Sequence, residues 1–569
     1  MSESASKNEP TLTTAVLWRR NLEAIKTRPP QELSGLQELL LLQPWPGPWV
    51  QARDGSLLAP VPEKQPLTAC FSTYDRTKEA QRWLEGIPTS SLVLWGGPSP
   101  QAILGLLERS VPLIVIIEPR LAFWQATLSS ADWSEILTHP SIFIPSTPQE
   151  FNHLLQTRHL PLWDRTLSVV EWRATADFER DAWNHAWQQV QDSWKGDLST
   201  QARMGRLWLR QSLTNLARLK PFRLVWEPWD TVIIAGAGPG LESALESPSN
   251  RKLLFDRPAN VKLFAVDTAL PALICRGIEP DLIVSLDGQM VSYQHFLPAF
   301  PPHIPILADL ASLPLLNRLT NPLLRFLSAQ PLHRWIASRY PDLPQLLTPF
   351  GQVAGSALEA AYQWGAQKAL LWGLDFAYPQ AKTYARGTYI YPYFDQRANR
   401  LQPLDSNMVG FAFRTSSVQH WQTPQGLSYT NAVLQGYRTQ LQTGVATWSM
   451  NFESWDGKGL PLQLPVTGRT SPHKGATFLS ILTNPEQWKE FQRDLQRLWS
   501  SLPKPAPEQT WRTYAQTLSS AQVEAWLALW PLAAWSNGHT GSGPASLTSS
   551  WQEIFADSRQ KALEILRDI

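Results

Sequence analysis

The feature that most constrains the fold is a short apolar run that breaks into glycines, Thr231-Val-Ile-Ile-Ala-Gly-Ala-Gly-Pro-Gly240. It resumes as Leu241–Glu246, so the segment predicts a buried strand, a tight turn and the start of a helix. Further along, the apolar run Leu263–Val266 predicts a second buried strand that ends on the carboxylate of Asp267. Together these segments predict a doubly wound sheet that binds a nucleotide at its carboxyl edge.

Strands and helices also alternate elsewhere in the chain, which indicates parallel sheets. We predict an α/β fold with two Rossmann-like doubly wound units, joined by a helical connector and followed by a helical C-terminal region. The expected parts are a loosely structured lead-in (1–60), an N-terminal Rossmann-like domain (61–165), the connector (170–222), a central nucleotide-binding α/β domain (223–390), a lid or elaboration (391–475) and a C-terminal helical domain (476–569).

Several expected elements rest on weaker patterns. The connector shows helical periodicity with a break near Lys195–Leu198, and Leu67–Ser72 and His333–Ser338 are candidate strands. In the lid we expect one clear helix, Thr430–Leu441, and in the C-terminal region one helix over Gln522–Trp535.

Composition narrows the class of protein. The 569 residues include 50 basic and 48 acidic side chains, a formal net charge of +2, without a Lys/Arg block of the kind that marks nucleic-acid binding. The polar N-terminus has no apolar core, so we expect no secretory signal. The longest apolar runs are strand-sized, and the two cysteines fit a reducing compartment. We therefore expect a cytoplasmic protein that binds neither nucleic acid nor membranes.

The glycine turn is the first candidate for a binding site. It lacks the third glycine of the dinucleotide fingerprint and the lysine of a P-loop. Gly236, Gly238 and Gly240 would let the backbone approach a phosphate, and Pro239 presets the helix start, whose free N–H groups attract an anion. The alternative is a tight strand-to-helix turn without a ligand.

Polar side chains follow the next two predicted strands. Asp267 and Thr268 end the second strand, where they would contact a ribose or base, or cap the following helix. Ser285, Asp287 and Gln289 end the third strand. Because ligands bind in the crevice at the carboxyl ends of such strands, we expect Asp287 to be functional.

Two later segments add candidates to the same edge. Gly355 and Ser356 open a predicted helix and would provide a second nucleotide contact. Gly373 and Asp375 follow the last strand of the domain. Asp267, Asp287 and Asp375 could thus converge, and neighbouring carboxylates suit general acid/base chemistry because one of their pKa values is raised.

The N-terminal domain carries a fainter version of this pattern. The turn Gly96-Gly-Pro-Ser-Pro100 follows a predicted strand, and Glu118 ends the next one at a spacing typical of a ribose-binding acid. The alternative is a degenerate Rossmann-like domain without a ligand.

Motifs for other chemistry are absent from the sequence. It contains no DxD, HExxH, CxxC or GxSxG motif, and the ten histidines are scattered without ligand-like spacing. We expect each histidine to be structural and assign no metal ligand, which leaves strand-end aspartates as the only plausible ligands for a hard cation.

The order of the central motifs resembles that of the motility-associated factor (Maf) glycosyltransferases and of the related 6-hydroxymethylpterin diphosphokinase MptE-like domain. The segments are GAGPG, FAVDTALPALICRGIEPDLIVSLDGQ, GQVAGSALEAAYQWGA, LLWGLDFAY and TYARGTYI, within Leu207 to Thr388. The stretch LVLWGGPSP…LIVIIEP is similar to the N-terminal part of Maf proteins.

The resemblance implies a cytoplasmic enzyme that transfers a nonulosonic acid from a CMP-linked sugar donor to Ser or Thr of flagellin, without a required metal. Asp287 or Asp375 would be the base, and the glycine turn, Asp267, Thr268, Ser285, Gln289, Gly355, Ser356 and Gly373 would hold the nucleotide. An MptE-like enzyme would instead move diphosphate from ATP to a pterin alcohol and need Mg²⁺.

The chain departs from the family pattern at three positions. Gly240 replaces a usual Ser, Gly288 a usual Pro, and Tyr384 a common His. These changes keep a third possibility open, a non-catalytic scaffold that binds flagellin or a flagellar chaperone.

Overall fold

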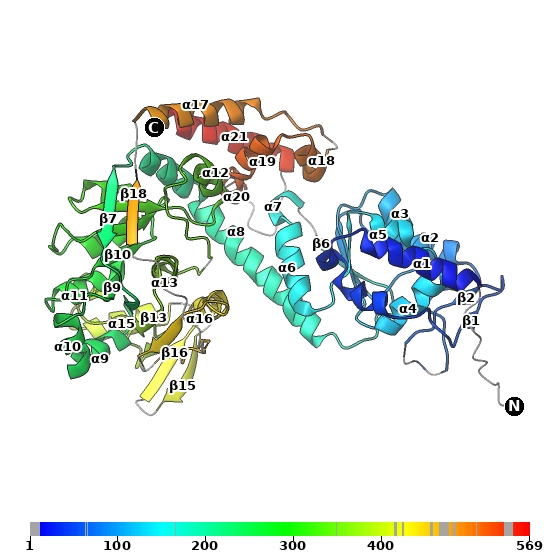
Figure 1. Cartoon of the computed structure of the whole chain (residues 1–569), viewed down its shortest axis with the longest axis horizontal. Coiled ribbons are helices and arrows are strands. Elements are labelled where there is room, and N and C mark those ends of the chain that lie inside the picture. Colours follow the sequence, from blue (N-terminus) through cyan, green and yellow to red (C-terminus); the bar gives the residue numbers. More distant parts are fainter. Residues whose placement is uncertain are drawn as a thin grey trace. The chain divides into compact units, whose positions relative to one another are not determined.

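The computed structural model describes residues 12–569 except 63, 65, 165–166, 349, 415–417, 424–425, 456–458, 466–476, 482–484, 508 and 540–549. Two compact units divide the chain. Unit 1 comprises Met1–Gln201, Pro505–Thr517 and Asn537–Glu553, and unit 2 comprises Ala202–Lys504, Leu518–Ser536 and Ile554–Ile569. Figure 1 labels many of their helices and strands.

Unit 1 is built on a four-stranded parallel sheet in the order β5-β4-β3-β6. The strands are β3 (Ser91–Trp95), β4 (Ile114–Ile117), β5 (Ile142–Phe143) and β6 (Leu167–Glu171). Alternate residues of β3 and β4 belong to two separate apolar clusters, so the sheet is covered on both faces, as parallel sheets require. The helices that follow these strands are α3 (Pro100–Glu108), α4 (Leu121–Ser130), α5 (Ser134–Thr138) and α6 (Pro148–Arg158), and α2 (Arg76–Glu85) precedes β3.

The N-terminal segment contains the one helix expected near Thr14–Ala24 and is otherwise more ordered than a loose lead-in. Helix α1 (Leu12–Lys26) and the 3₁₀ helix η2 (Ser34–Leu41) bury Trp18, Ile25 and Leu36 in the same apolar cluster as β3 and β4. The lead-in therefore contributes to the core of unit 1. The predicted strand Leu67–Ser72 is wrong, because this segment makes only an isolated bridge from Ala69 to Pro60.

The predicted connector contains one helix, α8 (Asp181–Leu216), which runs for 36 residues. The expected break near Lys195–Leu198 is wrong, because a helical glycine with open space around it, Gly196, costs too little to interrupt a helix of this length. The boundary between the two units falls within α8, after Gln201.

Unit 2 contains a parallel seven-stranded sheet in the order β12-β11-β10-β9-β8-β13-β17. Its strands are β8 (Thr231–Ala235), β9 (Val261–Val266), β10 (Leu282–Ser285), β11 (Ile306–Asp309), β12 (Leu323–Phe326), β13 (Lys368–Trp372) and β17 (Asn451–Ser454). The chain adds β9 to β12 on one side of β8 and then β13 and β17 on the other. The strand order therefore reverses between β8 and β13, which in such sheets places a crevice at their carboxyl ends.

Unit 2 differs from the expectation in three places. His333–Ser338 is helical, in α12 (Pro331–Arg339), where Pro331 occupies the first turn as proline does at a helix start. Strand β12 was not predicted. The expected lid supplies strand β17 to the central sheet and contains the helices α14 (Ile390–Asp395), α15 (Leu404–Ala412) and α16 (Ala432–Gly444). It also contains β15 (Gln419–Thr423) and β16 (Gly426–Thr430), which form a small antiparallel sheet with β14 (Tyr378–Pro379) of the preceding segment.

The remaining elements are mostly helical. Strand β7 (Phe222–Trp226) pairs antiparallel with β18 (Thr477–Ile481). The C-terminal helices are α17 (Pro485–Ser501), α18 (Trp511–Gln516), α19 (Ser520–Leu527), α20 (Trp530–His539) and α21 (Trp551–Arg567). The single helix expected over Gln522–Trp535 is thus two helices. The predicted fold class, α/β with parallel sheets and a helical C-terminal region, is confirmed.

Candidate functional site

The glycine turn lies at the carboxyl ends of β8 and β13, where the strand order of the sheet reverses. It begins the short helix α9 (Gly240–Glu246). The turn is joined to the segment after β13 by backbone hydrogen bonds, from Gly236 N to Trp372 O (2.7 Å) and from Gly238 N to Gly373 O (2.9 Å). The two predicted segments therefore form one double loop.

Close packing explains the glycines of this double loop. A Cβ atom at Gly236 would lie 2.5 Å from the carbonyl oxygen of Gly373, and one at Gly238 would lie 2.1 Å from Oδ2 of Asp375. A Cβ at Gly240 would lie 2.5 Å from Oδ1 of the same carboxylate. Gly373 itself has a positive φ of 68°, which favours glycine. The turn needs glycine whether or not a ligand is bound.

The anion nearest the start of α9 is the side chain of Asp375. Its Oδ2 accepts a hydrogen bond from Gly240 N at 2.8 Å. Asp375 is buried, and burial raises the pKa of its carboxyl to about 6, against the lowering effect of the Gly240 hydrogen bond. This contact fills the place expected for a phosphate at this N-terminus and favours the alternative of a turn without a ligand. A phosphate at Gly236, Gly238, Pro239 and Gly240 stays a prediction.

Three other predicted residues come together at the ends of β9 and β10. Asp267 Oδ2 accepts a hydrogen bond from the Ser285 hydroxyl at 2.6 Å. Its Oδ1 accepts from Thr268 N at 2.6 Å and from the Thr268 hydroxyl at 3.1 Å. Asp267 and Ser285 are buried. Three hydrogen-bond donors therefore fix the orientation of the Asp267 carboxylate.

A histidine that the sequence analysis treated as structural completes this cluster. His295, in the 3₁₀ helix η4 (Met290–Phe296), places Nε2 3.3 Å from Oγ1 of Thr268. Its Nδ1 is buried and has no hydrogen-bond partner within the described ranges. The ring of Tyr389 lies edge-on to the imidazole, with ring centroids 4.6 Å apart. No periodicity or spacing indicated His295, because it reaches the cluster through the irregular connection after β10.

Electrostatics couple His295 to two carboxylates. Burial lowers the pKa of His295, and the charges of Asp267 and Asp287 act in the opposite direction. Burial raises the pKa of Asp287, which the charge of Asp267 raises further. Lowered histidine and raised carboxyl pKa values of this kind are typical of functional sites.

Hydrogen bonds between side chains and the backbone fix the segment around Asp287. Asp287 Oδ1 accepts from Gln289 N at 2.8 Å, and Gln211 Nε2 donates to Gly288 O at 2.7 Å. A Cβ at Gly288 would lie 2.3 Å from Oε1 of Gln211 in α8 and 3.0 Å from the carbonyl oxygen of Ala311, so close packing favours glycine here. Of the predicted carboxylates, Asp267 and Asp287 act on each other, while burial and backbone hydrogen bonds determine the pKa of Asp375.

The second predicted helix start is α13 (Val353–Gln363), which packs on β8, β9 and β10. Gly355 and Ser356 are buried in its first turns, and a Cβ at Gly355 would lie 2.3 Å from Cβ of Phe350. Packing alone therefore accounts for Gly355, and its contact with a nucleotide stays a prediction.

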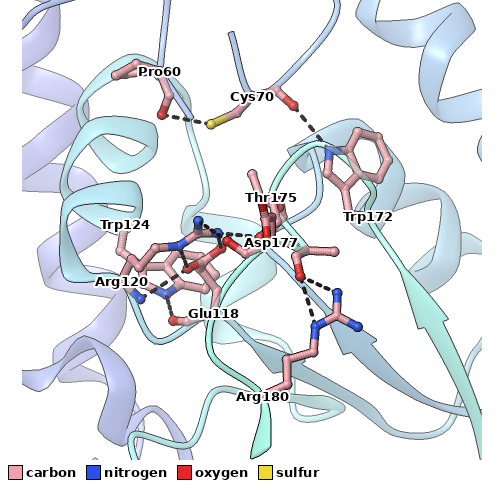
Figure 2. A network of polar contacts seen from close by, with 11 residues as sticks. Pro60, Cys70, Glu118, Arg120, Trp124, Trp172, Thr175, Asp177 and Arg180 are labelled. Carbon is pink, nitrogen blue, oxygen red and sulfur yellow. Dashed lines mark hydrogen bonds and ion pairs between the residues drawn. The ribbon is translucent and has the colours of Figure 1, made fainter. Parts of the chain in front are cut away.

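In the N-terminal domain, the chain's own side chains fill the place where the turn Gly96–Pro100 and Glu118 were expected to meet a ligand (Figure 2). Arg120 donates from Nε and Nη2 to the two carboxylate oxygens of Glu118, each at 2.7 Å, and from Nη1 to Asp177 O. A Cβ at Gly96 would lie 2.7 Å from Oγ1 of Thr175, and one at Gly97 would lie 2.0 Å from the ring of Phe123. Glu118 is fully buried in this ion pair, which favours the alternative of a Rossmann-like domain without a ligand.

Two further observations concern metals and membranes. Within the described ranges, no three His, Cys, Asp or Glu side chains are grouped so that they could hold a metal ion. Among the same residues, no helix combines the length and apolar character that crossing a bilayer requires.

Comparison with known proteins agrees with this architecture. The chain shares its fold with a solved structure described as the MAf glycosyltransferase from Magnetospirillum magneticum AMB-1, at a TM-score of 0.51 and 14% sequence identity, over 98% of this chain and 91% of that one. Curated relatives include uncharacterized proteins of Treponema pallidum (strain Nichols). One is 32% identical over 160 residues, which are 27% of this chain and 57% of the relative, and another is 28% identical over 299 residues, 49% and 59%.

These alignments span little more than half the length of those relatives. Residues 210–381 match the family described as 6-hydroxymethylpterin diphosphokinase MptE-like. That range begins in α8 and includes the glycine turn, the Asp267 cluster and Asp375. The central domain of this chain is therefore an MptE-like domain, set in a fold shared with a Maf glycosyltransferase.

Proposed function

We propose that the protein is a glycosyltransferase that moves a sugar from a nucleotide donor to a hydroxyl group of a protein acceptor. The observation that carries the proposal is the buried Asp267, Thr268, Ser285 and His295 cluster beside Asp287, at the carboxyl edge of an MptE-like domain. In more detail, we propose a CMP-linked nonulosonic acid as donor and Ser or Thr of flagellin as acceptor, in the cytoplasm.

The hydrogen bonds of the cluster suggest which group takes the acceptor proton. Thr268 has one hydroxyl hydrogen, and its hydroxyl donates to Asp267 at 3.1 Å. The contact of 3.3 Å between Thr268 and His295 is then a donation from Nε2–H of the imidazole. Nδ1 consequently carries a lone pair and has no hydrogen-bond partner among the residues that the structure describes. It is available to accept a proton.

In the proposed reaction, His295 is the general base and Asp287 supports it. Burial keeps the imidazole neutral at physiological pH because it lowers the pKa. When Nδ1 takes the proton of the acceptor hydroxyl, the charges of Asp267 and Asp287 stabilise the imidazolium. The acceptor oxygen attacks the anomeric carbon of the donor, and the nucleotide leaves with the bonding electrons.

Asp287 itself is the alternative base, because its raised pKa also suits proton transfer. Asp375 fits this role less well, since its Oδ2 already accepts from Gly240. In the proposed binding mode, Gly355, Ser356, Gln289 and Gly373 lie along the nucleotide.

The first test measures nucleotide binding to the purified full chain by calorimetry, with CMP, UDP, GDP and ATP, each with and without Mg²⁺. We expect metal-independent CMP binding, followed by transfer from CMP-nonulosonic acids to flagellin, detected as a mass increase of the acceptor. A His295→Asn variant should bind CMP normally and transfer poorly. Unchanged transfer by both His295→Asn and Asp287→Asn would contradict the proposed chemistry.

A second candidate function rests on the family match of residues 210–381, an MptE-like transfer of diphosphate from ATP to an alcohol. Asp267 and Asp287 are the carboxylates that could hold Mg²⁺ with the ATP phosphates there. ATP binding that requires Mg²⁺, with AMP formed in the presence of a hydroxymethylpterin, would favour this function. The absence of binding by every nucleotide would favour a scaffold.

A further inference from the structure

Unit 2 contains a cavity that shares no residue with the candidate site. Its volume is about 510 Å³. The walls are two segments, 218–223 between α8 and β7 and 317–323 between the 3₁₀ helix η5 (Pro314–Arg318) and β12, together with Arg325 of β12. Asn321 fixes one wall, because its Nδ2 donates to Pro301 O (2.9 Å) and Ile304 O (3.0 Å). The volume is in the range of small-molecule binding sites.

The charged side chains that line the cavity are all basic. The lining includes Arg218, Lys220, Arg223, Arg318 and Arg325 but no aspartate or glutamate. Arg218, Lys220 and Arg318 are exposed, and none of them forms an ion pair with a carboxylate in the part of the chain that the structure describes. Since cations gathered in a concave site repel one another, their presence favours an anionic ligand.

The fifth cation, Arg325, is the strongest indication. Its side chain is fully buried on β12, yet its hydrogen-bond acceptors are neutral, namely Asp309 O, Ser312 Oγ, Asn215 Oδ1 and Asn317 Oδ1. Its Nε is buried and no hydrogen-bond acceptor meets it in the described part of the chain. Among the described residues no carboxylate forms an ion pair with this guanidinium, although the charge of Asp309 acts on it. A buried charge without a directly paired counter-ion is costly, and an anion in the cavity would supply that partner.

Arg325 nevertheless keeps its proton at neutral pH. Burial lowers the pKa of its guanidinium to about 9, and the charge of Asp309 offsets part of that lowering. The lining of the cavity therefore includes five basic side chains, of which that of Arg325 is buried.

The rest of the lining is uncharged and combines apolar side chains with Asn317, Thr320 and Asn321. Leu219, Phe222, Leu319 and Leu323 contribute hydrocarbon surface between the basic groups. From this combination we infer that the cavity binds the phosphate groups of a small phosphorylated metabolite, whose organic part packs against this apolar surface. The inference is independent of the proposed transferase function, because the two sites have no residue in common.

The test is calorimetric titration of the full chain with three probes: inorganic pyrophosphate, CDP and glucose 1-phosphate. The test variant is Lys220→Ala with Arg318→Ala, two exposed side chains whose loss leaves the core intact. The matched control is Arg251→Ala with Lys252→Ala, two exposed cations of α10 (Pro248–Phe255) in the same domain. A Thr268→Val variant reports on the candidate site.

We expect the dissociation constant of pyrophosphate to rise at least tenfold in the Lys220/Arg318 variant, because each lost charge-assisted hydrogen bond is worth about a factor of ten or more. The control and Thr268→Val should bind as the wild type does. CDP or glucose 1-phosphate should bind more tightly than pyrophosphate, and the tighter of the two identifies the organic part.

Three results would overturn the inference. They are the absence of pyrophosphate binding, an equal loss in the Arg251/Lys252 control, and retention of full affinity by the Lys220/Arg318 variant. If pyrophosphate binds as tightly as both organic phosphates, the apolar part of the inference is wrong. Loss of CDP binding in Thr268→Val alone would assign that nucleotide to the candidate site and remove it from the cavity.

Discussion

At the scale of single residues, Asp375 has the environment with the clearest consequence for stability. The carboxyl is buried and its pKa rises from 3.8 to about 6, so the folded protein holds this proton more tightly than the unfolded chain does. The free energy of unfolding therefore falls as pH rises from about 4 to 6, by on the order of 3 kcal/mol for this group.

Asp375→Asn should remove that pH dependence while the amide oxygen still accepts from Gly240. The melting temperature of the variant, relative to wild type, should then rise between pH 4 and pH 7. Thermal unfolding at several pH values checks this, with the exposed Asp342→Asn as control. Parallel profiles for wild type and Asp375→Asn would show that the carboxyl titrates normally.

His295 leads to a second prediction at this scale, on activity. A neutral imidazole is the active form of the base, and burial lowers its pKa, so transfer should stay fast to pH values below the usual histidine range. His295→Asn should reduce kcat/KM by about 10²- to 10⁴-fold, the usual contribution of a general base. Because the charge of Asp287 raises the pKa of His295, Asp287→Asn should move the acid limb of the profile to lower pH.

The measurement is kcat/KM against pH for wild type, Asp287→Asn and the exposed control Asp256→Asn. An acid limb that stays in place when Asp287 is neutralised would contradict the proposed pairing of the two groups.

At the scale of elements, the double loop after β8 and β13 depends on glycine. Gly240→Ala would press a methyl group against the Asp375 carboxylate, at an initial 2.5 Å, and should destabilise unit 2 by about 1–3 kcal/mol. Gly410→Ala is the matched control, since Gly410 lies in α15 with open space around it and alanine is the better helix former. Denaturant unfolding measures both.

A double-mutant cycle sharpens this test. Asp375→Ala removes the atoms that the new methyl would meet, so its combination with Gly240→Ala should cost less than the sum of the two single changes. Additive costs would place the strain elsewhere in the turn.

The elements also show what a sequence can and cannot predict. The strands β3, β4, β8, β9, β10 and β13 are short apolar runs bounded by turn residues, and for that reason they could be located. Strand β12 was missed because it carries Arg325, and β17 because Asn451–Ser454 is polar and lies at an edge of the sheet. Because parallel strands end together, the carboxyl edge predicted that Asp267, Asp287 and Asp375 could converge. In the structure the charge of Asp267 acts on Asp287, while the Asp375 carboxylate accepts a hydrogen bond from Gly240. His295 could not be predicted, because only the path of an irregular connection brings it there.

At the scale of the whole molecule, the two units are not linear segments of the sequence. Unit 1 takes Pro505–Thr517 from the C-terminal region, and this insertion supplies the partners of a buried carboxylate. Asp164, at the end of α7 (Pro161–Asp164), accepts from Trp511 Nε1 at 2.7 Å and pairs with Arg512, 348 residues later in the chain. Domain boundaries predicted as continuous ranges cannot assign a C-terminal segment to unit 1. Periodicity and composition carry no information about which distant residues pair.

The stability of unit 1 should therefore depend on a residue that the sequence assigns to the C-terminal helices. Arg512→Ala removes the ion-pair partner of Asp164, whose side chain is only 2% exposed, a change that should cost about 3 kcal/mol. Arg497→Ala is the control, since its pair with Asp494 is solvent-exposed and should contribute less than about 1 kcal/mol. Limited proteolysis during a thermal ramp, with fragments identified by mass, should show that Arg512→Ala exposes residues 12–201 at lower temperature than Arg497→Ala does. Cleavage of both variants at the wild-type temperature would mean that the Asp164 to Arg512 pair does not stabilise unit 1.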